Sequence, residues 1–343
     1  MNRAVSVGFA IALFASPNPL PAANFSSRIE RVEFLGRDYV RLADWARVNN
    51  FESRGATGGK ILQLTNHYHK LTFEVDSREA GIDGVKVALS FPVAARFGIG
   101  YIAAIDLQST VQPLLYPRKT SGSKIKTICL DAGHGGRDTG NIHGGAQEKK
   151  YTLLLAQELR GQLTRAGFNV VLTRTADSSV ELPARAAIAN QRGADLLVSL
   201  HLNATPSSRN TVKGIETYCF TPAGASSSNA GGRGAEARPS RGNRNDEKNV
   251  LLAYQLQRAL AKNLSAEDRG VKRARFQVLR DAEMPAVLIE AGFLSHPTEG
   301  RKLIDPAYRR QMAKAIVGGI ETYRKIIEPT APRTPDPKPQ TPK

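Results

Sequence analysis

Two histidines and two glutamates in the second half of the chain have the types that a hydrolytic metal centre needs: His134, Glu148, His201 and Glu290. Two imidazoles and one carboxylate leave a fourth position open on Zn²⁺, which is the arrangement of catalytic zinc sites. Zinc lowers the pKa of a bound water to about 7, and a second carboxylate can take its proton and return it to a leaving amine. We therefore expect His134, Glu148 and His201 to be ligands and Glu290 to be the base.

Three of these side chains follow predicted strands directly. The strands are 126–130 before His134, 196–200 before His201 and 286–289 before Glu290. Ligand crevices of open α/β sheets form at the carboxyl ends of strands, so the three are expected at one edge. Taken singly, His201 would fit as a satisfied core histidine, and Glu148 as an acidic residue before a helix. Their placement together favours a site.

The elements that must position these residues alternate between strands and helices. Apolar runs predict strands over 126–130, 169–172, 196–200, 214–220, 275–279 and 286–289. Leucines four residues apart, from Leu155 to Leu163 and from Leu252 to Leu264, predict helices between them. We therefore predict an α/β domain over 125–327, with a mostly parallel sheet flanked by helices.

A weaker pattern organises the N-terminal region, which we predict to be a small α+β repeat domain over 28–116 that serves in binding or as a spacer. The motif Gly36-x-x-Tyr39-Val40-x-x-x-Asp44 returns as Gly98-x-x-Tyr101-Ile102-x-x-x-Asp106, and each copy is typical of a short strand followed by a helical turn. Asp83-Gly84 predicts a tight turn between two strands. The polar, basic residues 117–124 predict a linker.

Both ends of the chain differ from these regions. Residues 1–23 combine a basic start, a short apolar run and small residues, which is typical of a secretory signal peptide. Residues 328–343 alternate Pro with polar residues and predict a disordered tail. The apolar run of the signal is too short for a spanning helix, and no later segment fits one. We expect export to the periplasm or the extracellular space.

The charge of the chain predicts an anionic partner. Its 343 residues include 48 Lys and Arg against 31 Asp and Glu, a formal net charge of +17. Nucleic acid is disfavoured, because no zinc-finger spacing or aromatic-interleaved basic motif accompanies the charge. The only two cysteines, Cys129 and Cys219, exclude a disulfide scaffold, and their apolar strand positions predict buried free thiols.

Six ordered segments of the second domain resemble the zinc-dependent N-acetylmuramoyl-L-alanine amidases, which cleave peptidoglycan. They are LDAGHGGRDTGN (130–141), QEKKYTLLLAQEL (147–159), VVLTRTAD (170–177), ADLLVSLHLNA (194–204), GIETYCF (214–220) and PAVLIEAGFLSHPTE (285–299). The resemblance implies that His134, Glu148 and His201 bind Zn²⁺ and that Glu290 is the catalytic carboxylate. It implies hydrolysis of the amide between N-acetylmuramic acid and L-alanine, in peptidoglycan catabolism and wall remodelling. The N-terminal motif is similar to the domain named after the N-terminal domain of copper amine oxidases.

The sequence also departs from this family. Division-associated relatives carry a helix that blocks the zinc until an activator protein releases it, so an activator is a further partner that the resemblance allows. Here the insert 222–248 is rich in Gly, Ser, Ala and Arg, and we expect a flexible loop near the active site. Glu236 or Glu247 in it is a weaker candidate for an inhibitory metal ligand. His143 and His296 are rival candidates for ligand and substrate contact, while Arg174 and Arg185 are expected to be structural or substrate-orienting.

Three other functions stay open at this point. A zinc peptidase that cuts within the stem peptide would use the same metal site. A non-catalytic wall-binding protein would have lost a ligand or the second carboxylate, and all four residues are present. A nucleic-acid-binding protein would rest on charge alone. The favoured partners are peptidoglycan and anionic wall polymers.

Overall fold

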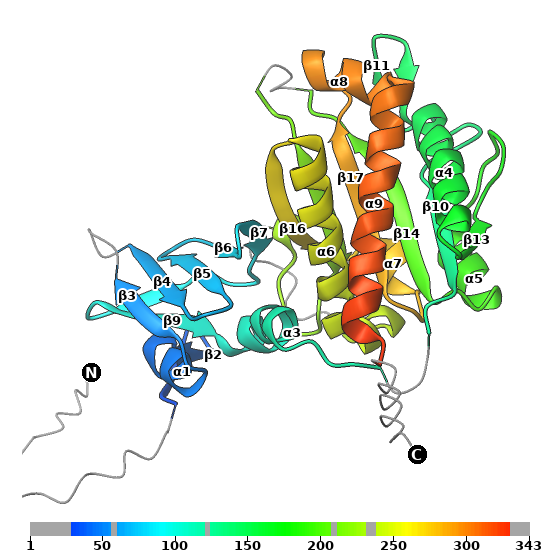
Figure 1. The fold of residues 1–343 in the computed structure, drawn as a ribbon. Helices are drawn as coiled ribbons and strands as arrows, with labels where there is room; N and C mark the ends of the chain where they lie inside the picture. The colour runs from blue at the N-terminus through cyan, green and yellow to red at the C-terminus, as the bar shows by residue number, and fades with distance from the viewer. Residues whose placement is uncertain (1–28, 56–59, 121–123, 207–210, 231–237, 330–343) are drawn as a thin grey trace, which may run out of the picture.

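The computed structural model describes residues 29–55, 60–120, 124–206, 211–230 and 238–329. The predicted signal peptide and nearly all of the predicted tail lie outside these residues. Two sets of elements follow each other along the chain, one before and one after residue 120, and we call them the N-terminal and C-terminal regions (Figure 1). No helix among the described residues has both the length and the apolar character that crossing a membrane requires.

The C-terminal region supplies six strands of one large sheet. They are β10 (Thr127–Ala132), β13 (Asn169–Leu172), β14 (Leu196–Asn203), β15 (Ile215–Phe220), β16 (Asp268–Ala274) and β17 (Ala286–Phe293). Their order in space is β13-β10-β14-β17-β15-β16. Its main helices are α4 (Glu148–Arg165), α5 (Leu182–Gln191), α6 (Asp246–Leu264), α7 (Gln277–Arg280), α8 (Pro297–Ile304) and α9 (Pro306–Ile327), and a small hairpin joins β11 (Ile142–His143) to β12 (Ala146–Gln147). The α/β class is confirmed.

The expectation of a mostly parallel sheet is not confirmed, because the sheet is mixed. β13, β10, β14 and β17 run parallel, but β15 runs antiparallel to β17. The connection between β14 and β15 is only residues 204–214, and its described residues, 204–206 and 211–214, form no helix. A parallel return requires a crossover of a dozen or more residues, so β15 starts at the edge where β14 ends and runs back.

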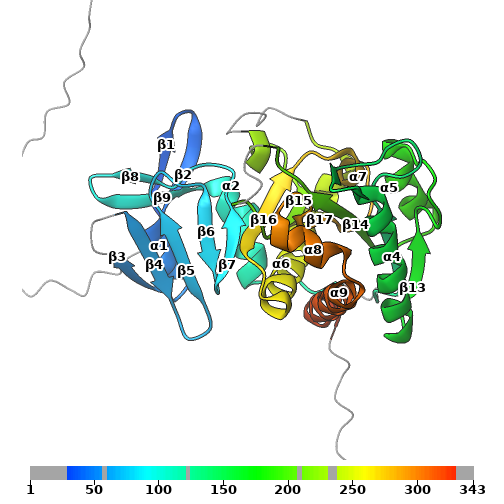
Figure 2. The ribbon, with the colours of Figure 1, turned by 90° about the horizontal axis from the view of Figure 1, so that it is seen from above.

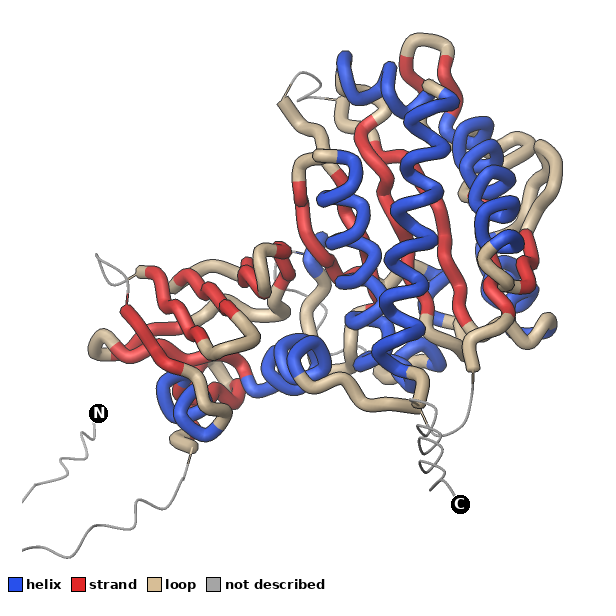
Figure 3. Tube along the Cα trace, viewed as in Figure 1, coloured by secondary structure: helices blue, strands red, loops and turns tan. Residues whose placement is uncertain are grey.

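Alternation along each strand separates the two faces of the sheet. On β14, Leu200 and Val198 join the large core under α4, α6 and α9, while Leu197 joins a smaller core on the other side. Figure 2 shows α4, α6 and α9 on one side of the sheet and α5 and α7 on the other, and Figure 3 shows the long helices covering nearly the whole first face. We call these the helical face and the open face.

The sheet continues into the N-terminal region. β16 pairs in parallel with β7 (Val85–Ala88) through Val271 and Val87, and Lys86 N donates to Asp268 Oδ2 at 2.8 Å. From β7 the sheet continues as an antiparallel series through β6 (Glu79–Ile82), β5 (Lys70–Glu74), β4 (Ile61–Thr65) and β3 (Glu52–Gly55). The two regions therefore share one sheet of 11 strands.

A second sheet, in the order β1-β2-β9-β8, contains the two copies of the repeated motif. Its elements are β1 (Arg31–Phe34), β2 (Arg37–Arg41), β8 (Ala94–Arg96) and β9 (Ile99–Ala103); α1 (Leu42–Val48) follows β2, and α2 (Ala104–Asp106), a π-helical turn (Leu107–Val111) and α3 (Gln112–Leu115) follow β9. Asp44 accepts from the backbone N–H of Glu30, and Asp106 from those of Ser90 and Phe91. Each motif aspartate thus anchors the chain that enters the hairpin of its own copy.

Two features of the sequence prediction are wrong. The predicted strand 275–279 is absent, since residues 277–279 belong to helix α7. A strand that the sequence did not predict, β16, precedes it. The sequence of β16, Asp-Arg-Gly-Val-Lys-Arg-Ala, looks too polar for a strand inside a sheet. It is tolerated there because Arg269 and Lys272 pair with the buried carboxylate of Glu216 on β15. By contrast, the Asp83-Gly84 turn is present, with both residues at positive φ between β6 and β7.

The described parts of the predicted flexible insert 222–248 make ordered contacts. Ser227 is buried and its Oγ lies 2.8 Å from Thr221 Oγ1. Residues 246–248 form the first turn of α6, so the insert prediction extends too far at that end. The two thiols are free and buried, as predicted. They belong to different cores, Cys129 on the open face and Cys219 on the helical face.

Candidate metal centre

The structure brings together three of the residues that the sequence predicts as ligands. His134, Glu148 and His201 each offer one ligand atom, and these atoms all lie within 4.8 Å of one another. Glu148 Oε1 lies 3.1 Å from His134 Nε2 and 3.0 Å from His201 Nδ1. Two ligand atoms that bind one zinc ion at about 2.0–2.1 Å in tetrahedral geometry lie about 3.3 Å apart. The spacing and donor types therefore fit a zinc ion.

His134 lies in the glycine-rich loop after β10, with a left-handed φ of 61°. A Cβ on Gly133 would lie 2.4 Å from Cε1 of His201, so only glycine allows the two histidines to approach. Asp138 Oδ2 lies 2.8 Å from His134 Nδ1 and thereby orients the ring with Nε2 toward Glu148. Asp138 was not among the predicted site residues, although it lies only four residues from His134.

Two buried arginines stabilise the glycine-rich loop after β10 through hydrogen bonds to its backbone carbonyls. Arg185 donates to the carbonyl of His134 at 3.1 Å, and Arg174 donates to the carbonyls of Ala132 and Gly133 at 2.9 Å each. Arg185 also binds the buried carboxylate of Asp131 at 2.8 Å. Of the two expected roles, these contacts assign the structural one to both arginines.

Asp131 lies at the centre of this support. Its carboxylate is fully buried and accepts hydrogen bonds from Thr173 Oγ1 and Ser199 Oγ at 2.7 Å each, besides the ion pair with Arg185. The network therefore links β10, the segment after β13, α5 and β14 beneath the metal centre. No sequence pattern indicated this network, because its members are distant in the chain.

Glu148 begins α4 and is 1% exposed. Burial alone would raise the pKa of its carboxyl, but the hydrogen bonds with His134 and His201 outweigh burial and hold that pKa well below its usual range. Asn141 donates to Oε2 from both its backbone and its side chain at 2.9 Å, and Leu202 N donates to Oε1 at 2.9 Å. The carboxylate is thus kept ionised and fixed in orientation.

Glu290 lies on β17, opposite His201 on β14 and Glu216 on β15. Both His201 and Glu290 lie inside strands that run further than the sequence predicts. Burial, with the nearby carboxylates of Glu148 and Glu216, raises the pKa of Glu290 to about 7, although His201 opposes this. Its Oε2 is buried and has no hydrogen-bond partner among the described residues. Such an acid can exchange a proton near neutral pH.

All four predicted residues line one cavity of about 330 Å³ on the open face. Its other walls combine apolar side chains with polar ones. The apolar ones are Leu182, Phe276, Val278 and Leu288, and the polar ones are Asp131, Asp138, Asn141, Arg185 and Gln277. Apolar walls reduce the access of water and strengthen the electrostatic interactions inside. The arrangement suits hydrolysis of an uncharged group such as an amide.

The rival histidines lie elsewhere. His143 belongs to the β11–β12 hairpin and is not among the three residues of the metal cluster. His296 is buried, and its Nδ1 accepts a hydrogen bond from Glu299 N at 3.2 Å at the start of α8. Its role in the described structure is that of a helix cap.

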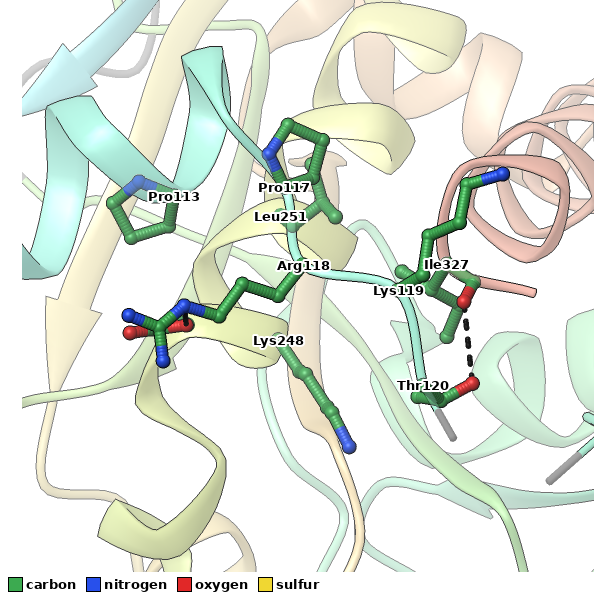
Figure 4. A pocket seen from close by; sticks show the side chains of 9 residues that line it. Pro113, Pro117, Arg118, Lys119, Thr120, Lys248, Leu251 and Ile327 are labelled. Atoms are coloured by element: carbon green, nitrogen blue, oxygen red, sulfur yellow. Dashed lines mark hydrogen bonds and ion pairs between the residues drawn. The ribbon is translucent and has the colours of Figure 1, made fainter. Parts of the chain in front are cut away.

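Glu247, one of the two weaker inhibitory candidates, is also placed away from the metal cluster. It lies at the start of α6 and faces Arg118 at 3.7 Å, in a pocket between the linker, α6 and the end of α9 (Figure 4). None of His134, Glu148 and His201 lines this pocket. Glu236, the other candidate, lies outside the described residues.

Comparison with known proteins gives consistent results. Residues 128–322 match the family described as N-acetylmuramoyl-L-alanine amidase. The N-acetylmuramoyl-L-alanine amidase AmiC of Neisseria meningitidis is 36% identical over 245 residues, which are 64% of this chain and 57% of that protein. LytC of Bacillus subtilis, also named as such an amidase, is 35% identical over 58% of this chain and 35% of its own length. The solved structure of AmiC2 of Nostoc punctiforme aligns with a TM-score of 0.50 and 30% identity, over 60% of this chain and 99% of that one. The chain thus spans about half of the Neisseria relative and a third of the Bacillus one.

Proposed function

Because the chain belongs to the N-acetylmuramoyl-L-alanine amidase family, we propose that it is a zinc-dependent peptidoglycan hydrolase. Its reaction would be hydrolysis of the amide bond between N-acetylmuramic acid and the L-alanine of the stem peptide. The observation that carries the proposal is the meeting of His134, Glu148 and His201 beside Glu290, a buried carboxyl with one oxygen unpartnered in the described structure.

The chain's own residues have distinct parts in this reaction. His134, Glu148 and His201 would hold the metal, and Asp138 orients the ring of His134. A zinc ion held there would polarise the substrate carbonyl and lower the pKa of a water molecule. Glu290 takes a proton from the attacking water and returns it to the alanine nitrogen as the C–N bond breaks. The products are a free lactyl carboxylate and a free amine.

Export and domain roles are part of the same proposal. A wall hydrolase acts outside the cytoplasm, which agrees with the secretory pattern of residues 1–23. The C-terminal region, over 125–327, would be the zinc amidase domain. The N-terminal region, over 28–116, would be a binding or spacer module, with 117–124 as linker and 328–343 as a tail. The net charge of +17 would attract the protein to peptidoglycan carboxylates or other anionic wall polymers.

The test is digestion of purified peptidoglycan by the full chain, with mass spectrometry of the released fragments and metal analysis of the protein. We expect intact stem peptides that begin with L-alanine, one zinc per chain, and loss of release on treatment with a chelator. Fragments cut between amino acids would instead support the zinc peptidase, and activity that survives complete metal removal would refute the proposal.

A further inference from the structure

The catalytic pocket is not the only polar feature of the open face. A row of charged side chains starts at His201 and crosses the sheet strand by strand. Glu290 is the register partner of His201, and Glu216 is the register partner of Glu290. The next strand, β16, places Arg269 and Lys272 on the same face, where both bind Glu216 Oε1, at 2.6 and 2.7 Å. The row therefore changes from acidic to basic as it leaves the catalytic centre.

The row ends where the two regions join. Lys86 on β7 lies against Gly270 of β16, so closely that a Cβ on this glycine would lie 2.9 Å from the Lys86 carbonyl oxygen. A cavity of about 280 Å³ opens here, and its charged lining is Arg78, Glu79, Lys86, Arg269 and Lys272. Figure 2 shows β16, β7 and β6 side by side at this junction. Arg78, Glu79 and Lys86 come from the N-terminal region, so neither region forms the cavity alone.

The charges of this junction cavity do not balance. Arg269 and Lys272 share one carboxylate oxygen of Glu216, whose other oxygen accepts from Tyr218 Oη at 2.8 Å. Arg78 is held by neutral carbonyl groups, those of Leu89 and Ser227, both at 3.2 Å. Glu79, the one acidic residue of the lining, lies 3.4 Å from Lys86. Three carboxylates, those of Glu79, Glu216 and Glu267, lie within 4.0 Å of these cations, whereas Arg78 has no ion pair within the described residues. The one positive charge left in excess favours an anion.

The distance between the junction cavity and the catalytic pocket indicates which anion the cavity would bind. Neighbouring strands lie about 4.8 Å apart, so β16 is about 10 Å from β17 and β7 about 14 Å from it. An extended peptide advances about 3.3–3.6 Å per residue. A stem peptide whose first amide lies at Glu290 would therefore bring its third or fourth residue over the junction cavity. A peptide attached through its amino end still has its C-terminal carboxylate, which is an anion of the right kind.

We propose that the junction cavity binds a carboxylate of the stem peptide and so acts as a specificity subsite of the amidase. The inference rests on the proposed function, because it assigns both pockets to one substrate. It gives the N-terminal region a direct part in substrate recognition, through Lys86 and Arg78. The substrate would lie across the open face, from the catalytic pocket toward β7.

The test compares two soluble probes, an N-acetylmuramoyl tetrapeptide with free carboxylates and the same compound with its C-terminal carboxylate converted to an amide. The protein is the full chain loaded with zinc. We expect Lys86→Glu to raise KM for the free-acid probe about tenfold, the effect of losing one charge-assisted hydrogen bond, with kcat changed less than twofold. Amidation should raise the KM of the unaltered protein similarly, and Lys86→Glu should then add little.

The matched control is Lys70→Glu, which makes the same charge change on exposed β5, outside the cavity lining. It should leave KM unchanged. Equal effects of the two substitutions, or equal KM values for the two probes, would overturn the subsite in favour of general charge attraction. Lys86→Gln, which removes the positive charge without introducing a negative one, is the second variant if Lys86→Glu does not fold.

Binding measured by calorimetry with the Glu290→Gln variant separates this inference from the proposed function. We expect the free-acid probe to bind about tenfold more tightly than the amide, a preference that added salt weakens. Absence of hydrolysis of either probe by the unaltered protein would refute the amidase function alone. Equal binding of the two probes would refute the subsite alone.

Discussion

The two faces of the central sheet are built from the same strands but differ in what they bury. The helical face contains a continuous apolar core under α4, α6 and α9. The open face contains a smaller apolar core and, above it, the buried charges of Asp131, Glu148 and Glu216. Since strand residues alternate between faces, neighbours such as Leu200 and His201 serve opposite purposes. The comparison indicates that one face provides most of the stability and the other the chemistry.

The largest effect should come from the open face. Replacing Glu290 with Gln removes the proposed proton acceptor while keeping the shape of the side chain, so kcat should fall by about 10²- to 10⁴-fold. Zinc content, measured by metal analysis, should remain unchanged. Glu283→Gln is the control, since this exposed carboxylate pairs with Arg241 outside the catalytic pocket. A loss of less than tenfold for Glu290→Gln would contradict the assigned role.

Substitution of Asp131 tests whether the open face also contributes to the stability of the fold. Asp131→Ala would leave the guanidinium of Arg185 buried without its carboxylate, and the free energy of unfolding should fall by about 4 kcal/mol. Urea denaturation measures this loss. Asp131→Asn, which keeps polar atoms at the same place, should lose less. If the Ala variant lost under 1 kcal/mol, the network beneath the metal centre would be dispensable.

The helical face should respond in stability alone. Leu256 on α6 is fully buried, and Leu256→Ala should lower the free energy of unfolding by about 3 kcal/mol with little change in kcat per folded molecule. Leu182 on the open face is 57% exposed, so Leu182→Ala should change stability by less than about 0.5 kcal/mol. Similar losses for both variants would remove the distinction between the faces.

The last effect concerns pH, in the metal-free protein. Glu290 has a folded-state pKa of about 7, against about 4.3 for a free Glu, so its protonated form is favoured in the folded chain. The stability that this proton gives is complete below about pH 4.3 and is lost as the pH rises to 7. Metal-free Glu290→Gln should therefore gain stability over the unaltered metal-free protein across this range, by at most about 4 kcal/mol. Denaturation at pH 5 and pH 8 measures the gain, and a constant difference would show that Glu290 is not perturbed.

The sequence could predict the site better than the sheet that holds it. His134, His201 and Glu290 follow apolar runs, and this placement can be recognised from the sequence alone. The direction of β15 depends on a short loop, and β16 is recognisable only once Glu216 is known to neutralise Arg269 and Lys272. Asp131 and Asp138 act through contacts in space, for which spacing gives no signal. The junction of β16 with β7 was equally hidden, because it joins strands from two regions of the chain.

The placement of the two thiols has a practical consequence. Cys129 and Cys219 lie on opposite faces of the sheet, so no oxidising enzyme can link them in the folded protein. Burial, with the Asp131 carboxylate, raises the pKa of Cys129 to about 12, which makes its thiol inert until that face opens. Each cysteine is thus a natural probe for one face. Timed alkylation of Cys129→Ser and Cys219→Ser variants would reveal which side of the molecule loosens first.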